Sequence, residues 1–280
     1  MKNKYSTQRK SINIVPTKTE FFKRAKQGNV ITVYRELLDD IETPVSAFLK
    51  ISKDQPYAFL LESVEGEEKV ARYSFIGTKP RWVWKSRGRY CQKIEGKDKT
   101  GELIQDPFNE IEKILKGYCC ISADDLPRFQ GGLVGYFSYD LVRFCENIPD
   151  KNPDPWILPE TYLMLVDQML IFDHAKHKIL VVANAILEHD SAAKAYEQAV
   201  QKIQRLIKLL KQPLTLFKTK RSMSQRNNLN KWFLRQKNTF KVVILFKGSY
   251  LNALKLKSPL SLLKSIEPCV PLTLLLICSI

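Results

Sequence analysis

The pattern of apolar and polar positions along the 280-residue chain predicts many short strands and a few helices. The clearest helix follows Ser191, because apolar residues recur there at spacings of three and four until Pro213 ends the pattern. These apolar positions are Ala192, Tyr196, Ala199, Ile203, Leu206, Ile207 and Leu210. A shorter helix is predicted between its cap Thr19 and Gly28, and another follows the capping residue Asp106.

Strands are predicted where β-branched and aromatic residues gather in short runs. These runs are residues 29–37, 43–52, 56–63, 71–77, 80–86 and 131–138. Residues 89–104 have the pattern of a hairpin, the segment after Tyr139 is expected to turn helical, and residues 161–187 resemble two long strands joined at Asp173–His177. Such a succession predicts an α+β fold, with a largely antiparallel sheet and flanking helices.

Net charge is concentrated near one end of the chain. The total is +16, and from Lys211 onward there are 13 basic residues and a single acid, Glu267. The first 210 residues therefore carry only +4. A strongly basic protein invites a nucleic-acid hypothesis, but a nearly balanced body with a basic tail and no matching aromatic motif argues against nucleic-acid binding.

The composition of the chain ends and the spacing of the cysteines predict a cytoplasmic location. Residues 1–18 are polar, lack the apolar run of a secretory signal and are expected to be flexible. The six cysteines show no CxxC spacing and no disulfide framework, which is typical of a reduced, cytoplasmic protein. The apolar run at 271–280 is far shorter than the ~20 residues that span a bilayer, so we expect no membrane anchor.

Two residue clusters suggest ligand sites and are better explained structurally. The glycines within 131–135 lack the Gly-Lys-Ser/Thr of a phosphate loop, and we expect them to permit close backbone approach in a strand. His174 and His177 lie near Asp173 in a turn, with no second cluster of ligands. A solvated hairpin tip therefore explains them better than a metal site.

The stretch LLESVEGEEKVARYSFIG, residues 60–77, ends an apolar strand in Glu62 and Ser63 and returns with Arg72. Glu62 could pair with the ammonium of an amino acid, and the Ser63 hydroxyl could hydrogen-bond either polar group of that ligand. Arg72 could neutralise a ligand carboxylate or Glu62 itself. For Arg72 we favour the simpler reading, a cross-strand surface pair with Glu62.

Four blocks of the sequence resemble one family, anthranilate synthase component I. Residues 60–77 are similar to its L-L-E-S…R-Y-S-F-I-G signature, and residues 130–149 to a second block, G-G-x-x-G-Y-x-x-Y-D with a following E-x-I/L-P turn. Residues 27–51 and 158–185 resemble its N-terminal strand-and-turn and a pair of later strands. The resemblance runs from about Thr19 to about Lys211 and implies the α+β N-terminal domain of that family.

The resemblance implies a regulatory function. L-E-S lies in the family's tryptophan feedback site, which implies L-tryptophan binding by Glu62 and Ser63, with Leu61 and Arg72 as possible support. The full-length family is a lyase that uses Mg²⁺ and ammonia from a glutamine amidotransferase subunit to convert chorismate to anthranilate and pyruvate. Aminodeoxychorismate synthase component I is similar in the same blocks and stays an alternative, as does a stand-alone tryptophan-binding module.

The family's catalytic motifs are not matched after Lys211. Mg²⁺ needs oxygen ligands, usually carboxylates, but this segment has one acid and no histidine, and the family's second tryptophan contact, P-Y-M, is absent. We therefore assign no catalytic residue, no metal ligand and no cofactor to this chain.

We expect the chain to be divided into three parts. They are the flexible N-terminus 1–18, a regulatory domain 19–213, and a basic tail 214–280 in place of the start of the catalytic domain. A frameshift after about Lys220 with a premature stop at Ile280 would explain the tail, which we expect to be poorly ordered beyond about Arg221 because it keeps no steady apolar period.

Overall fold

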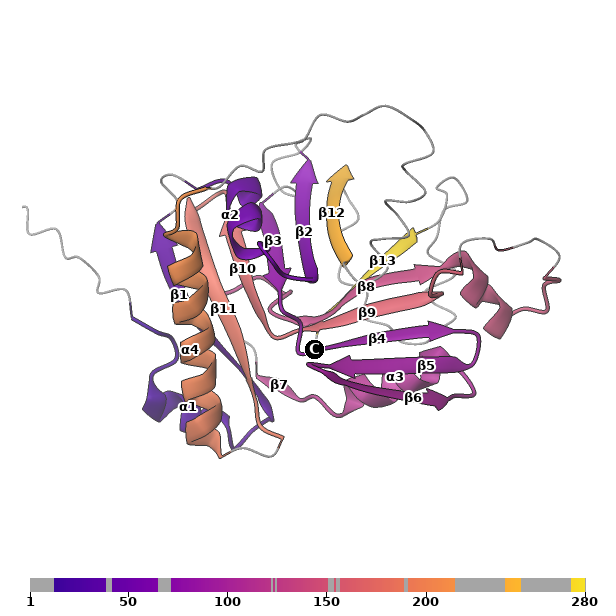
Figure 1. The fold of residues 1–280 in the computed structure, drawn as a ribbon. Coiled ribbons are helices and arrows are strands. Elements are labelled where there is room, and N and C mark those ends of the chain that lie inside the picture. The colour runs from indigo at the N-terminus through magenta and orange to yellow at the C-terminus, as the bar shows by residue number, and fades with distance from the viewer. Residues whose placement is uncertain are drawn as a thin grey trace, which may run out of the picture.

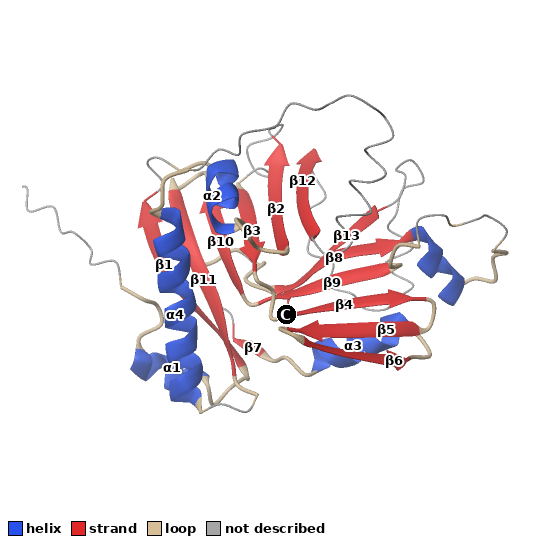
Figure 2. Cartoon of the chain, viewed as in Figure 1, coloured by secondary structure: helices blue, strands red, loops and turns tan. Residues whose placement is uncertain are grey.

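The computed structural model consists of two β-sheets with helices outside them (Figures 1 and 2). It describes residues 13–38, 42–64, 72–121, 123, 125–150, 154, 157–188, 191–214, 240–247 and 273–279, and for residues 63–64, 240–247 and 273–279 it describes the backbone alone. Strand pairing is antiparallel in both sheets except for two parallel pairs, β1 with β7 and β12 with β2, among these residues. The predicted α+β fold is confirmed.

Among the described residues the two sheets have seven and six strands, and the first has the order β12-β2-β3-β10-β11-β1-β7. Their bounds are β1 Val30–Leu38, β2 Tyr57–Val64, β3 Tyr73–Thr78, β7 Cys120–Ile121, β10 Gln168–Asp173, β11 Lys178–Ile186 and β12 Phe240–Lys247. The second sheet has six strands in the order β13-β8-β9-β4-β5-β6. These are β4 Trp82–Arg87, β5 Tyr90–Glu95, β6 Asp98–Leu103, β8 Gly132–Ser138, β9 Thr161–Val166 and β13 Thr273–Ser279.

The helices cover the outer faces of the two sheets. They are α1 Lys18–Arg24, α2 Pro44–Ile51, α3 Pro107–Lys116, α4 Ala192–Leu210 and the 3₁₀ helix η1 Tyr139–Phe144. Helices α1, α2 and α4 share one apolar cluster with the first sheet, and α3 and η1 share another with the second sheet. A third cluster joins the facing sides of the two sheets. The order of layers is therefore helices, first sheet, second sheet, helices.

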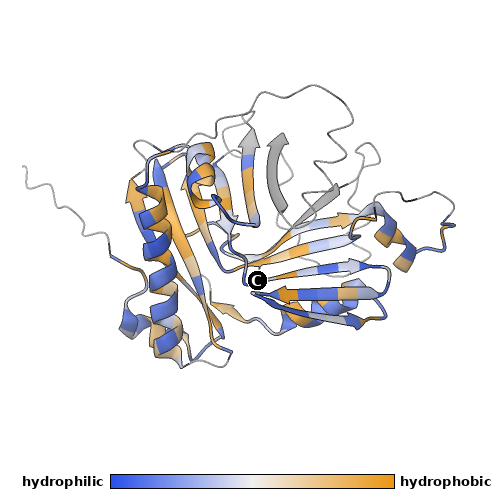
Figure 3. Ribbon diagram, in the orientation of Figure 1, coloured by the Kyte–Doolittle hydropathy of each residue, from blue (hydrophilic) through white to orange (hydrophobic). Residues whose placement is uncertain are grey.

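Helix α4 forms as its periodicity predicts. Ser191 caps it by accepting a hydrogen bond from the Lys194 amide, and its buried positions face β11 and β1. These positions are Ala195, Ala199, Ile203, Leu206, Ile207 and Leu210. Figure 3 shows largely hydrophilic residues on the opposite, outward side. The hairpin β5–β6, the Asp106 cap of α3 and the helical turn after Tyr139 are also confirmed.

Helix α2 occupies residues that the sequence analysis assigned to a strand. Thr43 accepts a hydrogen bond from the Ser46 amide while the Ser46 hydroxyl accepts one from the Thr43 amide, which is a reciprocal capping box. Pro44 is pre-shaped for the first helical turn, and the buried Phe48 and Ile51 lie on one helical face. The strand prediction is wrong because these local signals outweigh the β-branched content.

Helix α1 begins earlier than the sequence analysis expected. Thr17, not Thr19, is its cap and accepts a hydrogen bond from the Glu20 amide. Just before it, Val15 forms a bridge with Tyr34 of β1 through hydrogen bonds of 2.9 and 2.7 Å. Residues 13–18 are therefore attached to the first sheet, and residues 1–12 of the expected flexible N-terminus lie outside the described part.

The segment 161–187 forms three strands rather than two. Strand β9 belongs to the second sheet and β10 to the first, so the chain changes sheets at Asp167. This carboxylate is buried and accepts a hydrogen bond from Lys202 of α4 at 2.7 Å, and its backbone carbonyl accepts the Asn184 amide at 2.7 Å. The hairpin turn between Asp173 and His177 is confirmed.

Two tail segments add strands to the sheets. Strand β12 pairs with β2 in parallel, and β13 pairs with β8 antiparallel, as Figure 1 shows. The tail beyond about Arg221, expected to be poorly ordered or loosely packed, thus contains two segments that pair with the sheets. The other residues of 215–280 lie outside the described part.

Gly135 is required by the close approach of β8 and β9. A Cβ atom on Gly135 would overlap the backbone carbonyl of Tyr162 in β9, and neither strand can retreat without breaking the ladder. The predicted structural use of this glycine is confirmed, because backbone is the least adjustable neighbour a side chain can meet.

We expect Gly135→Ala to lower the free energy of unfolding by about 1–3 kcal/mol, as overpacking of a core does. Gly101→Ala is the matched control in another strand, since its Cβ would meet only the far end of the half-exposed Tyr90 side chain, which can move. Its cost should stay within about 0.5 kcal/mol. Equal urea midpoints for the two variants would contradict this account.

Candidate functional site

Glu62 and Ser63 lie near the C-terminal end of β2. The pairing of β2 with β3 ends at Leu61 opposite Phe75, while pairing with β12 continues with Leu245 opposite Glu62 and Phe246 opposite Ser63. Glu62 is half-buried, and it lies on the same face of the sheet as Leu60 because strand side chains alternate. Among the described residues, no hydrogen bond or ion pair satisfies its carboxylate.

Leu61 supports this strand end from inside the protein. Its side chain is fully buried in the apolar cluster between the sheets, with Phe59 and Phe75. The role open to Leu61 is therefore to fix the position of β2. It offers no exposed surface to a ligand.

Arg72 binds Asp173, a partner that the sequence analysis did not consider. Its guanidinium donates two hydrogen bonds to this carboxylate, Nε to Oδ1 at 3.0 Å and a terminal nitrogen to Oδ2 at 2.8 Å. It also lies 4.9 Å from the centre of the Tyr73 ring. The expected pair of Arg72 with Glu62 is wrong, because the guanidinium of Arg72 is bound to the carboxylate of Asp173.

The Asp173 carboxyl group is buried, and burial alone would raise its pKa. Hydrogen bonds from Arg72 and from the Lys176 amide outweigh that effect, so the pKa of Asp173 lies below its usual range. Asp173 ends β10, 101 positions from Arg72 in the chain. Only the meeting of β3 and β10 reveals the pair, which is why no sequence spacing signals it.

A second polar pair lies beside this one. The fully buried Ser74 hydroxyl is 2.8 Å from Nε2 of His174, and the His174 ring stacks on Phe172 at 6.4 Å. His177 adopts a left-handed backbone conformation in the same hairpin turn, with φ of 49°. Within the described residues no three side chains of His, Cys, Asp and Glu gather in a way that could hold a metal ion.

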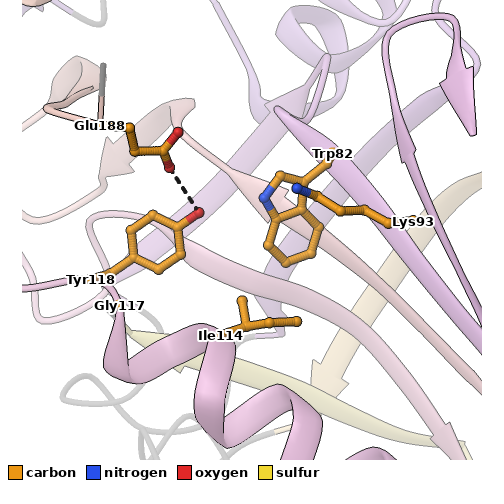
Figure 4. A pocket seen from close by; sticks show the side chains of 6 residues that line it. All are labelled: Trp82, Lys93, Ile114, Gly117, Tyr118 and Glu188. Atoms are coloured by element: carbon orange, nitrogen blue, oxygen red, sulfur yellow. Dashed lines mark hydrogen bonds between the residues drawn. The ribbon is translucent and has the colours of Figure 1, made fainter. Parts of the chain in front are cut away.

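A cavity of about 260 Å³ lies elsewhere, where strands β4 and β5 meet the end of α3. Its lining residues are Trp82, Lys93, Ile114, Gly117, Tyr118 and Glu188. Figure 4 shows Tyr118 and Glu188 on one side of the space and Trp82 with Lys93 on the other. No pattern in the sequence signals this cavity, because its residues come from four separate segments.

Each charged group of this cavity is paired with a neighbouring side chain. Glu188 accepts hydrogen bonds from Arg81 at 2.6 Å and from Tyr118 at 3.3 Å, and Lys93 pairs with Glu95 at 3.1 Å. Burial raises the pKa of the Tyr118 phenol. These contacts connect β4 and β5 with the segments that follow α3 and β11, so the cavity is a polar junction of the fold with no spare charge for a ligand.

Comparison with known proteins identifies the family. The family model for chorismate binding enzymes matches residues 56–239, which include Glu62, Ser63, Arg72 and Asp173. The chain belongs to the chorismate binding enzymes. The match continues past Lys211 and Lys220 and ends directly before β12.

Curated members of the family agree with the resemblance in the sequence. Anthranilate synthase component 1 of Synechocystis sp. is 39% identical over 204 residues, and that of Aquifex aeolicus is 40% identical over 198 residues. The alignments cover 72% and 71% of this chain, which spans about 40% of the length of each relative. The predicted resemblance to anthranilate synthase component I is confirmed.

A solved structure of anthranilate synthase component I from Streptococcus pneumoniae is also similar. It is 21% identical, with a TM-score of 0.42 over 63% of this chain and 37% of that protein. In the part of this chain that the structure describes, no helix is long and apolar enough to cross a membrane.

The ion pair of Arg72 and Asp173 should make stability depend on pH. Because the folded-state pKa of Asp173 is depressed, its contribution is present above the ordinary value of about 3.9 and is lost as pH falls through the lower folded value. We expect Arg72→Ala to raise the pKa of Asp173 and to lower the urea midpoint at pH 7, with the difference vanishing at low pH.

Carboxyl NMR titration and urea unfolding from pH 2 to pH 7 measure both effects. Asp173→Asn is the control, because it removes the buried carboxylate and leaves only the partly exposed Arg72 guanidinium, which water can solvate. It should flatten the pH dependence that the unmodified chain shows. An Arg72→Ala protein with an unchanged Asp173 titration would contradict the assignment.

Proposed function

We propose that this chain is the N-terminal, tryptophan-sensing part of an anthranilate synthase component I. One observation carries the proposal: Glu62 of the L-E-S motif is a half-buried carboxylate, at the end of a core strand, that the described residues leave without a partner. Its position in a chain 39% identical to a curated anthranilate synthase component 1 supports this reading over aminodeoxychorismate synthase component I.

The site suits the ammonium end of an amino acid. A carboxylate partly removed from water forms charge-assisted hydrogen bonds about twice as strong as neutral ones. The buried residues Leu60 and Leu61 hold the strand in place, which keeps the entropic cost of ordering the site low. Arg72 is already bound by Asp173, so the ligand's carboxylate depends on other donors, among which we propose Ser63.

The domain boundaries remain part of the proposal. Residues 19–213 are the regulatory domain, and residues 214–280 replace the start of the catalytic domain, with a frameshift as their origin. The full-length family's partners, a glutamine amidotransferase subunit and Mg²⁺, then belong to the catalytic half. The described residues of this chain do not fit Mg²⁺, because they offer no cluster of three ligating side chains, and we propose no cofactor for it. A cytoplasmic location follows from the same function.

Tryptophan binding should depend on Glu62 and Ser63. Removing a charge-assisted hydrogen bond costs about 1.5–3 kcal/mol, and 1.4 kcal/mol is tenfold in affinity. We therefore expect calorimetry to show weak binding of L-tryptophan that drops at least tenfold in Glu62→Ala and in Ser63→Ala. Glu112→Ala, which removes an exposed carboxylate from α3, is the control and should leave the affinity unchanged. If Glu62→Ala binds as well as the unmodified chain, Glu62 is only part of a packed strand.

The 280-residue chain should show no chorismate lyase activity, because residues 212–280 contain one carboxylate and no histidine and Mg²⁺ binding requires several carboxylate oxygens. The assay supplies chorismate, Mg²⁺ and ammonia to the purified protein and follows anthranilate fluorescence. Heat-treated protein is the control. Turnover above that control would show that the catalytic residues are present after all.

A further inference from the structure

The end of β2 depends on a single neighbouring strand. From Tyr57 to Leu61 the strand lies between β12 and β3, and its pairs with β3 run from Ala58 opposite Thr78 to Leu61 opposite Phe75. From Glu62 to Val64 the strand pairs, among the described residues, with β12 alone, through Leu245, Phe246 and Lys247. In the described structure, hydrogen bonds to a neighbouring strand therefore hold this segment on one side only, and β12 provides them.

Strand β2 is also unsuited to the edge of a sheet. Phe59, Leu60 and Leu61 are each at most 1% exposed, and β12 is the last strand on this side of the sheet. Without β12, β2 would present unpaired amides and carbonyls on a flat, apolar strand, which natural proteins avoid because it pairs with other chains. The edge of β2 therefore has the chemistry of a strand acceptor.

We propose that the edge of β2 is a strand-acceptor surface whose occupant is the segment 240–247 of the same chain, and that docking of this segment orders Glu62–Val64. Parallel addition of a strand to an open edge is a known mode of recognition, in which main-chain hydrogen bonds provide the affinity. The ligand-binding consequence, though not the strand docking itself, rests on the proposed tryptophan function of Glu62 and Ser63.

Docking and ligand binding are then linked. A ligand that binds only the ordered strand end stabilises the docked state of β12, and docking raises the affinity for that ligand by the same factor, because coupling free energies are reciprocal. The segment between α4 and β12 is long enough for the crossover that a parallel pair requires. Docking of β12 at the edge of the sheet thereby controls the position of the Glu62 carboxylate without a charged contact to it.

Hydrogen exchange of the full chain, followed by mass spectrometry, tests the docking without any ligand. The variant Val242→Pro/Val243→Pro removes two successive amides of β12, one of which faces β2 because strand amides alternate. We expect exchange of residues 62–64 to accelerate at least tenfold, while β10 and β11 keep their protection. The matched control, Leu274→Pro/Leu275→Pro, disrupts β13 on the other sheet and should leave residues 62–64 unchanged.

The unmodified chain provides a second measurement in case the variant does not fold. There, residues 62–64 and 240–247 should exchange at rates within about threefold of each other, since one opening event exposes both. The proposal would be overturned if residues 62–64 stayed protected while residues 240–247 exchanged as fast as an unfolded chain. It would also be overturned if residues 62–64 exchanged at an unchanged rate in a folded Val242→Pro/Val243→Pro variant. Added L-tryptophan should slow the exchange of both segments. If the two segments exchange together but their rates do not change with tryptophan, the proposed function is contradicted and the strand docking still holds.

Discussion

The architecture depends on the crossing at Asp167, where the chain leaves one sheet and enters the other. A buried carboxylate is costly unless it is paired and hydrogen-bonded, and Lys202 of α4 provides the pair at 2.7 Å. The backbone carbonyl of Asp167 accepts a hydrogen bond from the backbone amide of Asn184 in β11. Strands of both sheets and helix α4 thus meet at one residue.

A buried polar network extends this crossing. The Asn184 side chain donates to the Gln130 carbonyl at 2.9 Å and accepts from the Thr32 hydroxyl at 2.9 Å. It occupies the space that a Cβ on Gly131 would need, and Gly131 has a φ of +149°. Apolar packing alone would allow the two sheets to slide, whereas a satisfied network in a low-dielectric interior specifies one arrangement.

The parts of the fold that the sequence predicted are those with local signals. Helix α4 has a steady apolar period and a serine cap, and the β5–β6 hairpin has its glycine-bearing tip. The capping box of α2 was readable at Thr43 and Ser46 but was outweighed by nearby β-branched residues. The sheet change at Asp167 has no such signal, because apolar runs on both sides make 161–173 look continuous.

The candidate site divides in the same way. The L-E-S motif identified Glu62 and Ser63 because the family resemblance is local, and their position at a strand end agrees with it. The partner of Arg72 could not be found, since Asp173 is brought to it only by pairing of β3 with β10. The strands of the tail were missed for a related reason: an edge strand held by backbone hydrogen bonds needs no strict alternation of side chains.

The bidentate contact of Arg72 with Asp173 has a consequence for which molecules the site can distinguish. An intramolecular carboxylate fixed at 2.8 and 3.0 Å is present at a high effective concentration. A free ligand's carboxylate competes with it poorly, so this arginine contributes little to recognition. Under the proposed function, recognition then falls to the carboxylate of Glu62, which selects for positive charge, and to the hydroxyl of Ser63. An indole amine without a carboxylate would keep the contact with Glu62 and lose the one proposed for Ser63.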